Sequence, residues 1–346
     1  MDDIKAFSYK QMLRNKKSKF IKLAGIMFII LIAAFILSMN LGVIRLSPWE
    51  VTKTLFGFGT AKQQLILFDF RLPRIVIAIL IGAGLSVSGA IMQGITRNPL
   101  ADPGILGINA GAGFGVVAFI LFFTGTANQS IFILPLVALV GGFTAAILIY
   151  ILSIKNGAVS PVRMILVGIG IGMLFNAFNL LFQMKMQYHQ FISAAIWLAG
   201  SIYGSNWKFV AALLPWILIL MPYAYYKSNI LNVMNLGEQN ATGLGVRIER
   251  ERFLLSLAAV ALASACVSIG GGISFVGLVA PHLARRLVGP RHEYLIPVSA
   301  VLGSILLLVS DMFARQLLAP NEIPTGIVVA VIGAPYFLYL LAKSDS

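Results

Sequence analysis

Few side chains in this 346-residue chain have the type and spacing that catalysis or metal binding needs. The three histidines, His189, His282 and His292, are scattered, with no pair at four-residue helical spacing and no cluster of cysteine or acidic partners. Cys266 is the only cysteine, which rules out an internal disulfide and a thiolate cluster. The phosphate-loop pattern Gly-x-x-x-x-Gly-Lys-[Ser/Thr] does not occur, so ATP hydrolysis by that chemistry is excluded. We expect no catalytic residue, no cofactor site and no metal ligand.

Glycines spaced four residues apart could serve either phosphate binding or helix packing. Gly107, Gly111 and Gly115 form one such series, and Gly168 and Gly172 form a second. Both clusters superficially resemble nucleotide fingerprints, but neither lies between a strand and a helix. We therefore predict that these glycines allow membrane helices to approach each other closely.

Arginines near the ends of apolar runs are the other candidates for chemistry. Arg71, Arg74 and Arg315 fall on the predicted outer side, and Asp311 precedes Arg315 by the four residues of an intrahelical ion pair. One interpretation makes these arginines snorkelling anchors at the lipid boundary. The other makes them docking residues, because guanidinium groups form bidentate bonds with the carboxylates of an acidic partner. The residue pattern leaves both open.

Residues 236–252 form the longest polar interruption in the second half of the chain. The segment holds three of the twelve acidic residues and separates the apolar runs 211–226 and 253–269. It must therefore be a loop, or short helices, outside the bilayer. We expect a water-soluble partner to bind it.

Composition identifies the elements that position these residues as membrane helices. The chain is 59% hydrophobic and 11% charged, with a mean hydropathy of +0.90, whereas roughly a quarter of residues are charged in soluble domains. Long continuous apolar runs exclude a barrel, and the length allows about ten spans. We predict an all-α polytopic membrane protein with about ten transmembrane helices and short interfacial and coupling helices. The net charge of +14 then indicates orientation and lipid contact, not nucleic acid.

Charge distribution orients the predicted spans. The tail 1–22 is rich in Lys and Arg, which fixes it inside, and most of the 26 Lys and Arg residues fall on the same side. No small-residue cleavage pattern follows the first apolar run, so we expect that run to be retained. The predicted spans are 23–39, 71–94, 104–123, 131–154, 163–184, 211–226, 253–269, 274–283, 295–312 and 324–341.

Shorter signals complete the predicted topology. Ser47-Pro48-Trp49-Glu50 is typical of a helix start in the outer segment 41–70. Residues 191–199 are apolar but too few to cross, which predicts an interfacial or re-entrant helix. Residues 155–161 form an inner turn closed by a proline, and the glycines at 270–272 permit a sharp reversal. Spans two to five and seven to ten begin on opposite sides, which suggests an inverted repeat.

Motifs along nearly the whole chain then resemble the permease subunits of ATP-binding-cassette (ABC) importers for iron-siderophore complexes, haem and cobalamin. The motifs are Arg71-Leu72-Pro73-Arg74, residues 84–93, Asn98 to Gly107, Gly237-Glu238 to Val246, Gly271 to His282, Asp311 to Arg315, Glu322 to Gly326, and Gly333-Ala334-Pro335. Their common order over this length is far more specific than any single glycine pattern. The resemblance implies that residues 1–346 form one permease domain with ten spans.

This resemblance also implies site residues. Residues 236–252 look like the pair of short cytoplasmic helices that fit a groove on the ATPase subunit. Family gates can carry small hydroxyl residues, and Pro161 and Val162 depart from that pattern. The implied ATPase-coupling residues are Glu238, Ala241, Gly243, Gly245 and Arg247; the implied docking residues for the external binding protein are Arg71, Arg74 and Arg315; the implied cytoplasmic gate is Ser160, Pro161 and Val162.

By the resemblance, the chain is a non-catalytic permease of the cell membrane with both termini cytoplasmic. We expect two ABC ATPase subunits, a second identical or related permease, an extracellular substrate-binding protein and membrane lipid as partners, and no nucleic acid. The expected substrate is a ferric siderophore, with cobalamin or haem as the alternative.

Two other classes of protein remain as competitors. An ion-coupled secondary carrier would work without ATP, but such carriers usually need intramembrane carboxylates, and we expect the spans to bury almost no charge. A passive channel would conduct as the purified chain alone.

Overall fold

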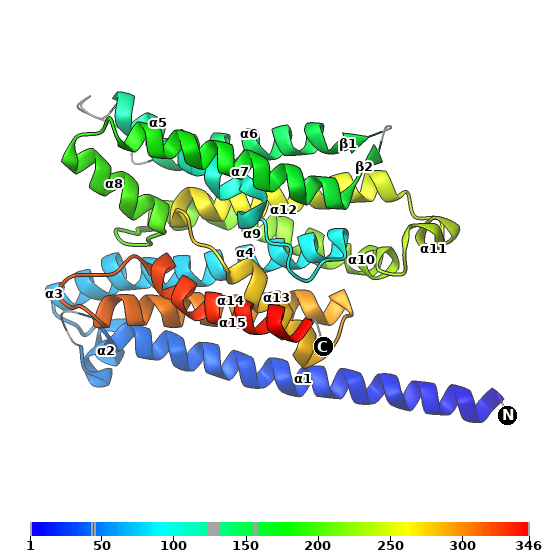
Figure 1. Ribbon diagram of the computed structural model, residues 1–346. Coiled ribbons are helices and arrows are strands. Elements are labelled where there is room, and N and C mark those ends of the chain that lie inside the picture. Colours follow the sequence, from blue (N-terminus) through cyan, green and yellow to red (C-terminus); the bar gives the residue numbers. More distant parts are fainter. Residues whose placement is uncertain (1, 43, 45, 124–131, 156–157, 345–346) are drawn as a thin grey trace.

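The structure is a computed structural model that describes residues 2–42, 44, 46–123, 132–155 and 158–344, and it is a bundle of helices (Figure 1). Seven of the described helices are long and apolar enough to cross a membrane, and two shorter apolar helices accompany them. These helices make the chain a multi-pass membrane protein. Ile131, at the start of the predicted fourth span, and Asn156 and Gly157, in the predicted inner turn, lie outside the described residues.

Element bounds follow the chain in order. The first half contains α1 (Asp2–Asn40), α2 (Pro48–Leu55), α3 (Ala61–Gln64), the π-helix η1 (Leu65–Arg71), α4 (Leu72–Thr96), the π-helix η2 (Gly104–Ile108), α5 (Asn109–Phe123), α6 (Ile133–Ser153), β1 (Ile154–Lys155), β2 (Ala158–Val159) and α7 (Pro161–Gln183). The second half contains α8 (Tyr188–Ala199), α9 (Trp207–Tyr226), α10 (Ser228–Met234), α11 (Glu238–Gly243), α12 (Ile248–Gly270), α13 (Val276–Val288), α14 (His292–Gln316) and α15 (Thr325–Ser344).

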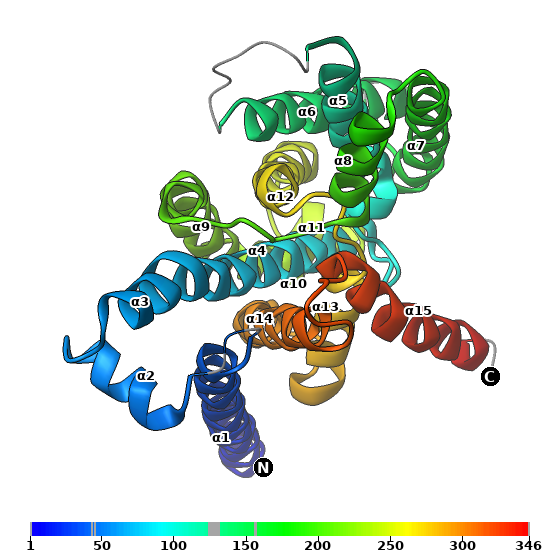
Figure 2. The ribbon, with the colours of Figure 1, turned by 90° about the vertical axis from the view of Figure 1, so that its left-hand side faces the viewer.

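Helix α4 is the centre of the bundle. Figure 2 shows it crossing between one group that includes α5, α6, α7 and α12 and a second group that includes α1, α13 and α14. The Ser88 hydroxyl donates to the Ala259 carbonyl of α12 at 2.6 Å, and a Cβ atom on Gly89 would collide with the Gly277 carbonyl of α13. Most of α4 is buried, whereas most of the stretch Ser18–Asn40 of α1 faces outward. The molecule is therefore built around α4, with α1 as a peripheral, lipid-exposed helix.

The predicted packing role of the spaced glycines is confirmed. A Cβ on Gly107 would lie 2.9 Å from the Gly168 carbonyl oxygen and 3.3 Å from the Gly172 nitrogen, so the two series pack against each other. Gly107 also has a φ of 88°, which favours glycine at this kink within η2.

Local signals around the ends of helices are also confirmed. Ser47 caps α2, its hydroxyl oxygen accepting from the Glu50 amide at 3.3 Å while the Glu50 carboxylate accepts from the Ser47 amide at 2.7 Å. These bonds, chiefly the one from the Ser47 backbone, lower the pKa of Glu50. The predicted reversal near residue 270 is present, because α12 ends at Gly270 and Gly271 has a φ of 69°.

Three elements differ from the predicted topology. Residues 61–70, predicted to lie in an outer connection, already form a helix that continues into α4 through η1. Pro73 has no amide hydrogen to donate, which fits the shift to π-helical bonding just before it. Residues 154–159 contain an antiparallel pair of two-residue strands that the sequence did not suggest. Helix α13 has 13 residues and is too short to cross the apolar layer alone. The exact number of spans remains a prediction.

Burial of charge also differs from the expectation. Arg74, Arg252, Asp311 and Arg315 all lie within helices that are long enough to span a membrane, and all four are buried. Each of them forms an ion pair with another residue of the chain. Low charge content therefore did not mean that the helices bury little charge.

Candidate functional site

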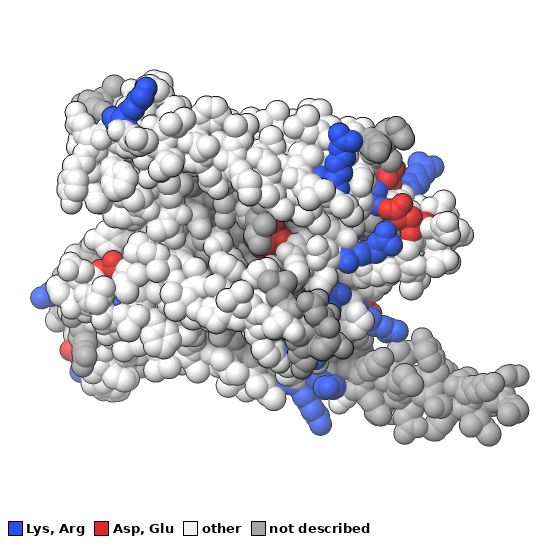
Figure 3. All heavy atoms as spheres, viewed as in Figure 1, with Lys and Arg blue, Asp and Glu red and all other residues white. Residues whose placement is uncertain are grey.

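The predicted site residues lie in two groups at opposite ends of the molecule. In Figure 1, α11 lies at one end with strands β1 and β2, and α3 lies at the other end with the start of α4. Figure 3 shows charged side chains mainly at these ends, with a nearly white belt between them. This distribution fits a protein whose middle faces lipid and whose ends face water.

Arg74 is the centre of the first group, the outer arginine cluster. Its Nη2 lies 2.8 Å from Oδ1 of Asp311 in α14, and its Nη1 lies 2.7 Å from Oε2 of Glu322. Thr325, at the start of α15, donates its hydroxyl to the same Asp311 oxygen at 3.2 Å. The cluster therefore joins α4, α14 and α15, and it does so across more than two hundred residues of sequence.

Arg315 extends this cluster toward α1. Its Nε lies 3.0 Å from Oδ2 of Asp311, which confirms the ion pair predicted from their spacing of four. Its Nη2 donates to the Ser38 hydroxyl at 2.6 Å, and its Nη1 donates to the Leu41 carbonyl at 3.3 Å. Arg315 thus holds the end of α1 against α14.

Arg71 completes the cluster through backbone contacts. Its guanidinium donates to the carbonyls of Met39 and Ile44, and no described carboxylate forms an ion pair with it. The exposed fractions of Arg71, Arg74 and Arg315 are only 6%, 8% and 4%. Their polar groups are occupied by protein atoms, so snorkelling to the lipid boundary does not describe them. Three arginines against Asp311 and Glu322 leave an excess of one positive charge.

The second group, the inner assembly, is built on α11. Glu238 at the start of α11 accepts from Nη2 of Arg252 in α12 at 2.6 Å, and Nη2 of Arg97 lies 3.7 Å from the same oxygen. Ala241 is fully buried, which fixes the inner face of α11. Gly245 follows α11 with a φ of +84°, a turn conformation that favours glycine. Gly243 and Arg247 are exposed beside it.

Arg252, the last residue of the predicted coupling segment 236–252, connects this assembly to the predicted gate, a role that its sequence context did not indicate. It is 3% exposed, and its Nη1 donates to the Val159 carbonyl of β2 at 2.9 Å and to Oε1 of Glu249 at 2.7 Å. Glu249 in turn accepts from the Val159 amide at 3.3 Å. The spacing of three residues between Glu249 and Arg252 at the start of a helix predicts their local ion pair. It does not predict the contact of Arg252 with Val159 on β2.

Gate residues Ser160, Pro161 and Val162 directly follow that contact. Ser160 is the residue before α7, and its carbonyl accepts from the Met164 amide at 2.9 Å. Pro161 is the first residue of α7, where its missing amide hydrogen costs nothing. Val162 is exposed. The predicted turn therefore ends at Ser160, and Pro161 and Val162 belong to the helix.

The segment 236–252 also differs in detail from the pair of helices that the resemblance implied. Helix α11 is the short helix inside it, α10 ends before it, and residues from Ile248 onward already belong to the long helix α12. A concave surface on α11 and the start of α12 encloses a volume of about 1010 Å³. Gln239, Thr242 and Arg247 are among the residues that line it. Its exposed position suits a soluble partner.

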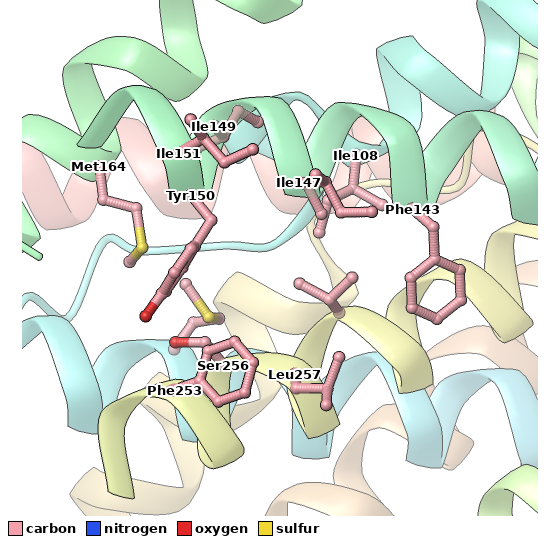
Figure 4. A pocket seen from close by; sticks show the side chains of 13 residues that line it. Ile108, Phe143, Ile147, Ile149, Tyr150, Ile151, Met164, Phe253, Ser256 and Leu257 are labelled. Atoms are coloured by element: carbon pink, nitrogen blue, oxygen red, sulfur yellow. The ribbon is translucent and has the colours of Figure 1, made fainter. Parts of the chain in front are cut away.

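An apolar cavity of about 260 Å³ lies between α6 and α12 (Figure 4). Ile108, Phe143 and Leu257 are among the residues that line it, and Tyr150 and Ser256 contribute hydroxyl groups. An almost wholly apolar lining does not suit a hydrophilic solute.

This chain is similar to known transport proteins along nearly its whole length. The FecCD transport family matches residues 30–343. The iron(3+)-hydroxamate import system permease protein FhuG of Bacillus subtilis (strain 168) is 53% identical over 337 residues, which cover 96% of this chain and 100% of that protein. The ferric enterobactin transport system permease protein FepG of Escherichia coli (strain K12) is 36% identical over 315 residues, 91% of this chain and 93% of that protein.

A solved structure is similar to this chain in its fold. It is described as an inward-facing conformation of a metal-chelate type ABC transporter, and it has a TM-score of 0.81 and 33% sequence identity to this chain. The match covers 93% of this chain and 99% of that one.

Proposed function

This chain belongs to the FecCD transport family, and we propose that it is the membrane-spanning permease subunit of an ATP-driven importer for ferric siderophores. The observation that carries the proposal is the end-to-end match to an iron(3+)-hydroxamate permease at 53% identity. Hydroxamate siderophores are accordingly the substrates to test first. Cobalamin and haem remain the alternative within the same kind of importer.

A chelated ferric ion suits this kind of permease. The siderophore already fills the coordination sphere of the metal with oxygen ligands, so the pathway needs no metal-binding side chains of its own. The permease instead needs a passage that closes alternately on either side. We propose that this passage forms between two permease subunits, identical or related, with two ATPase subunits beneath them.

Coupling to the ATPase is the first mechanistic part of the proposal. Helix α11 presents exposed residues around a concave surface, while buried Ala241 anchors its other face. Glu238 links α11 to Arg252, and Arg252 links directly to Val159 beside Ser160. A displacement of α11 by closing ATPase subunits would therefore pull on the gate residues Ser160, Pro161 and Val162. Gly243, Gly245 and Arg247 would shape the surface that the ATPase contacts.

Docking of the substrate-binding protein is the second part. The excess positive charge of the outer arginine cluster favours an acidic surface. Arg71 and Arg315 have hydrogen bonds to neutral backbone and hydroxyl oxygens that a partner's carboxylates could replace. Arg315 pairs with one carboxylate of its own chain, Asp311, whereas Arg74 binds two. We therefore assign docking to Arg71 and Arg315 and propose that Arg74 supports them.

Orientation is the third part. We propose that residues 1–346 act as one permease domain of the cell membrane, with about ten spans and with both termini in the cytoplasm. The dense Lys and Arg residues of the tail 1–22 support that orientation, and α11 lies at the same end of the molecule as the N-terminus.

Reconstitution tests the function directly. Liposomes containing this chain, its ATPase and a second permease should import a ferric hydroxamate only when ATP and the binding protein are both present. An ion-coupled carrier would import the chelate without ATP in response to a proton or sodium gradient, and a channel would pass it without either. Uptake independent of ATP would overturn the proposal.

A further inference from the structure

A basic pocket lies where α1 meets the turn between α13 and α14. Its volume is about 320 Å³, and three cationic side chains, those of Lys19, Arg286 and Arg291, line it. Phe20 of α1 and Tyr294 of α14 line it too, with their ring centroids 4.7 Å apart. The pocket is remote from the outer arginine cluster and does not include α11.

Cations in this pocket are weakly neutralised within the chain. The nearest ion pair joins Nη1 of Arg291 to Oε1 of Glu293 across 3.8 Å. Glu293 also accepts a shorter hydrogen bond of 2.7 Å from the Asn232 side chain. Arg286 lies 5.9 Å from the ring centroid of Tyr339, and no ion pair within the described residues involves Lys19 or Arg286. The pocket therefore carries a clear positive charge.

The position of the pocket relative to lipid indicates the source of the anion. Lys19 stands at the beginning of the apolar stretch Ser18–Asn40, and Arg291 directly precedes His292–Gln316, so both lie at the level where membrane helices leave the apolar layer. Further along α1, the side chains of Ile26, Ile30 and Leu37 are exposed and lie on the same helical face as Lys19. Leu287 adds an exposed apolar contact at the rim.

We propose that this pocket binds the headgroup of an anionic phospholipid, with the acyl chains lying along the exposed face of α1. Lys19, Arg286 and Arg291 bind the phosphate, and Phe20, Leu287 and the isoleucines of α1 contact the chains. Basic pockets between helices at the membrane surface recognise anionic headgroups in this way. The site requires only that the chain is in a membrane, so it does not depend on the proposed substrate.

Native mass spectrometry of the purified full-length chain tests the site. The chain would be exchanged into micelles that contain equal amounts of phosphatidylglycerol and phosphatidylcholine. We expect phosphatidylglycerol to be retained preferentially, and each neutralised cation to weaken its retention by about fivefold. The variant Lys19→Gln/Arg286→Gln/Arg291→Gln should therefore lose the preference.

A matched variant controls for net charge. Lys62→Gln/Lys185→Gln/Lys208→Gln removes the same charge from exposed positions on other elements and should keep the preference. Thermal unfolding of both variants in detergent checks that each is folded. If the triple pocket variant unfolds, the single variant Lys19→Gln replaces it. Lys19 is exposed, so this substitution should leave the fold intact and still lower the retention of phosphatidylglycerol.

Four results would overturn the assignment. Equal retention of the two lipids would show that the chain has no headgroup preference. Unchanged retention of phosphatidylglycerol in the pocket variants would show that the lipid binds elsewhere. Binding of inorganic phosphate to the delipidated chain as tight as that of phosphatidylglycerol would assign the pocket to a soluble anion. Loss of ATPase binding with unchanged lipid retention would assign it to a protein contact.

Discussion

The outer arginine cluster and the inner assembly on α11 use the same chemistry in opposite settings. Both pair an arginine with a carboxylate of another helix, Arg74 with Asp311 across 237 residues and Arg252 with Glu238 across 14. In the outer cluster, the central carboxylate Asp311 is 0% exposed, and its arginine partners are nearly as deeply buried. In the inner assembly, Arg252 is buried, but the side chain of Glu238 remains 52% exposed. The centre of the outer network, around Asp311, is closed within the chain, whereas the inner network has a free side for a partner.

This difference separates support from transmission. A sealed network cannot change without exposing or unpairing a buried charge, which is costly. A half-exposed carboxylate keeps part of its hydration, so its bond to Arg252 can shift at lower cost. We therefore expect Asp311 at the centre of the outer cluster to determine stability, Arg71 and Arg315 of that cluster to serve docking, and the inner assembly to determine coupling.

The largest effect should come from Asp311→Asn. The substitution leaves Arg74 and Arg315 without their shared charge partner in a buried site, at a cost of about 3 kcal/mol or more. Thermal unfolding in detergent should show a clear fall in melting temperature. Asp69→Asn, an exposed carboxylate near the same end, should leave the melting temperature unchanged. Equal melting temperatures for the wild type and Asp311→Asn would show that the cluster is not a stabilising element.

The next largest effect should be a loss of affinity for the substrate-binding protein when Arg71 and Arg315 are both replaced by glutamine. Loss of charge-assisted bonds to a partner's carboxylates costs about 2 kcal/mol or more, or roughly thirtyfold in affinity. Titration of the substrate-binding protein against the reconstituted permease measures this loss. Lys62→Gln removes an exposed charge from α3 and should change the affinity little. Unchanged affinity in the double variant would contradict the docking assignment.

Arg252→Gln should lower uptake by about tenfold, because coupling between two sites is commonly of this size. Its effect should fall on import much more than on ATP hydrolysis, since the motor is on another subunit. Arg163→Gln is the matched control: Arg163 also donates to a backbone carbonyl beside the hairpin, that of Leu152 at 3.0 Å. If both variants lose the same activity, the connection between α11 and β2 has no special role.

The smallest effect should come from protonation of the Glu50 carboxylate at low pH. Its pKa is lowered by the bonds to Ser47, so the capping box is fully formed above the usual carboxyl pKa and is lost as the pH falls through the lowered value. Hydrogen exchange of the first turn of α2 should therefore speed up in acid relative to intrinsic exchange. Glu50→Gln should remove this pH dependence without lowering uptake. A pH dependence that persists in Glu50→Gln would belong to another group.

Features set by neighbouring residues were predictable from the sequence. The Ser47 and Glu50 capping box, the ion pair of Asp311 with Arg315, and the glycine series at Gly107 all follow from spacing within one helix or its end. The resemblance likewise indicated the right family.

Features set by tertiary contact were not predictable. Arg74 meets Glu322 across 248 residues, and Arg252 meets Val159 across 93. Nothing in the local pattern around either arginine specifies such a partner. The burial of Arg71 among the carbonyls of Met39 and Ile44 likewise depends on how α1 ends beside η1. Residue type indicated that these arginines mattered, but only the packing shows what they bind.

A double-mutant cycle on Glu238 and Arg252 tests the central claim, that the ATPase drives the gate through this pair. The quantity to measure is the number of ferric hydroxamate molecules imported per ATP hydrolysed in reconstituted liposomes. We expect Glu238→Gln and Arg252→Gln each to lower this ratio, and the double variant to be no worse than the more severe single one. Unchanged ratios in the single variants, or losses that simply add in the double variant, would contradict the account.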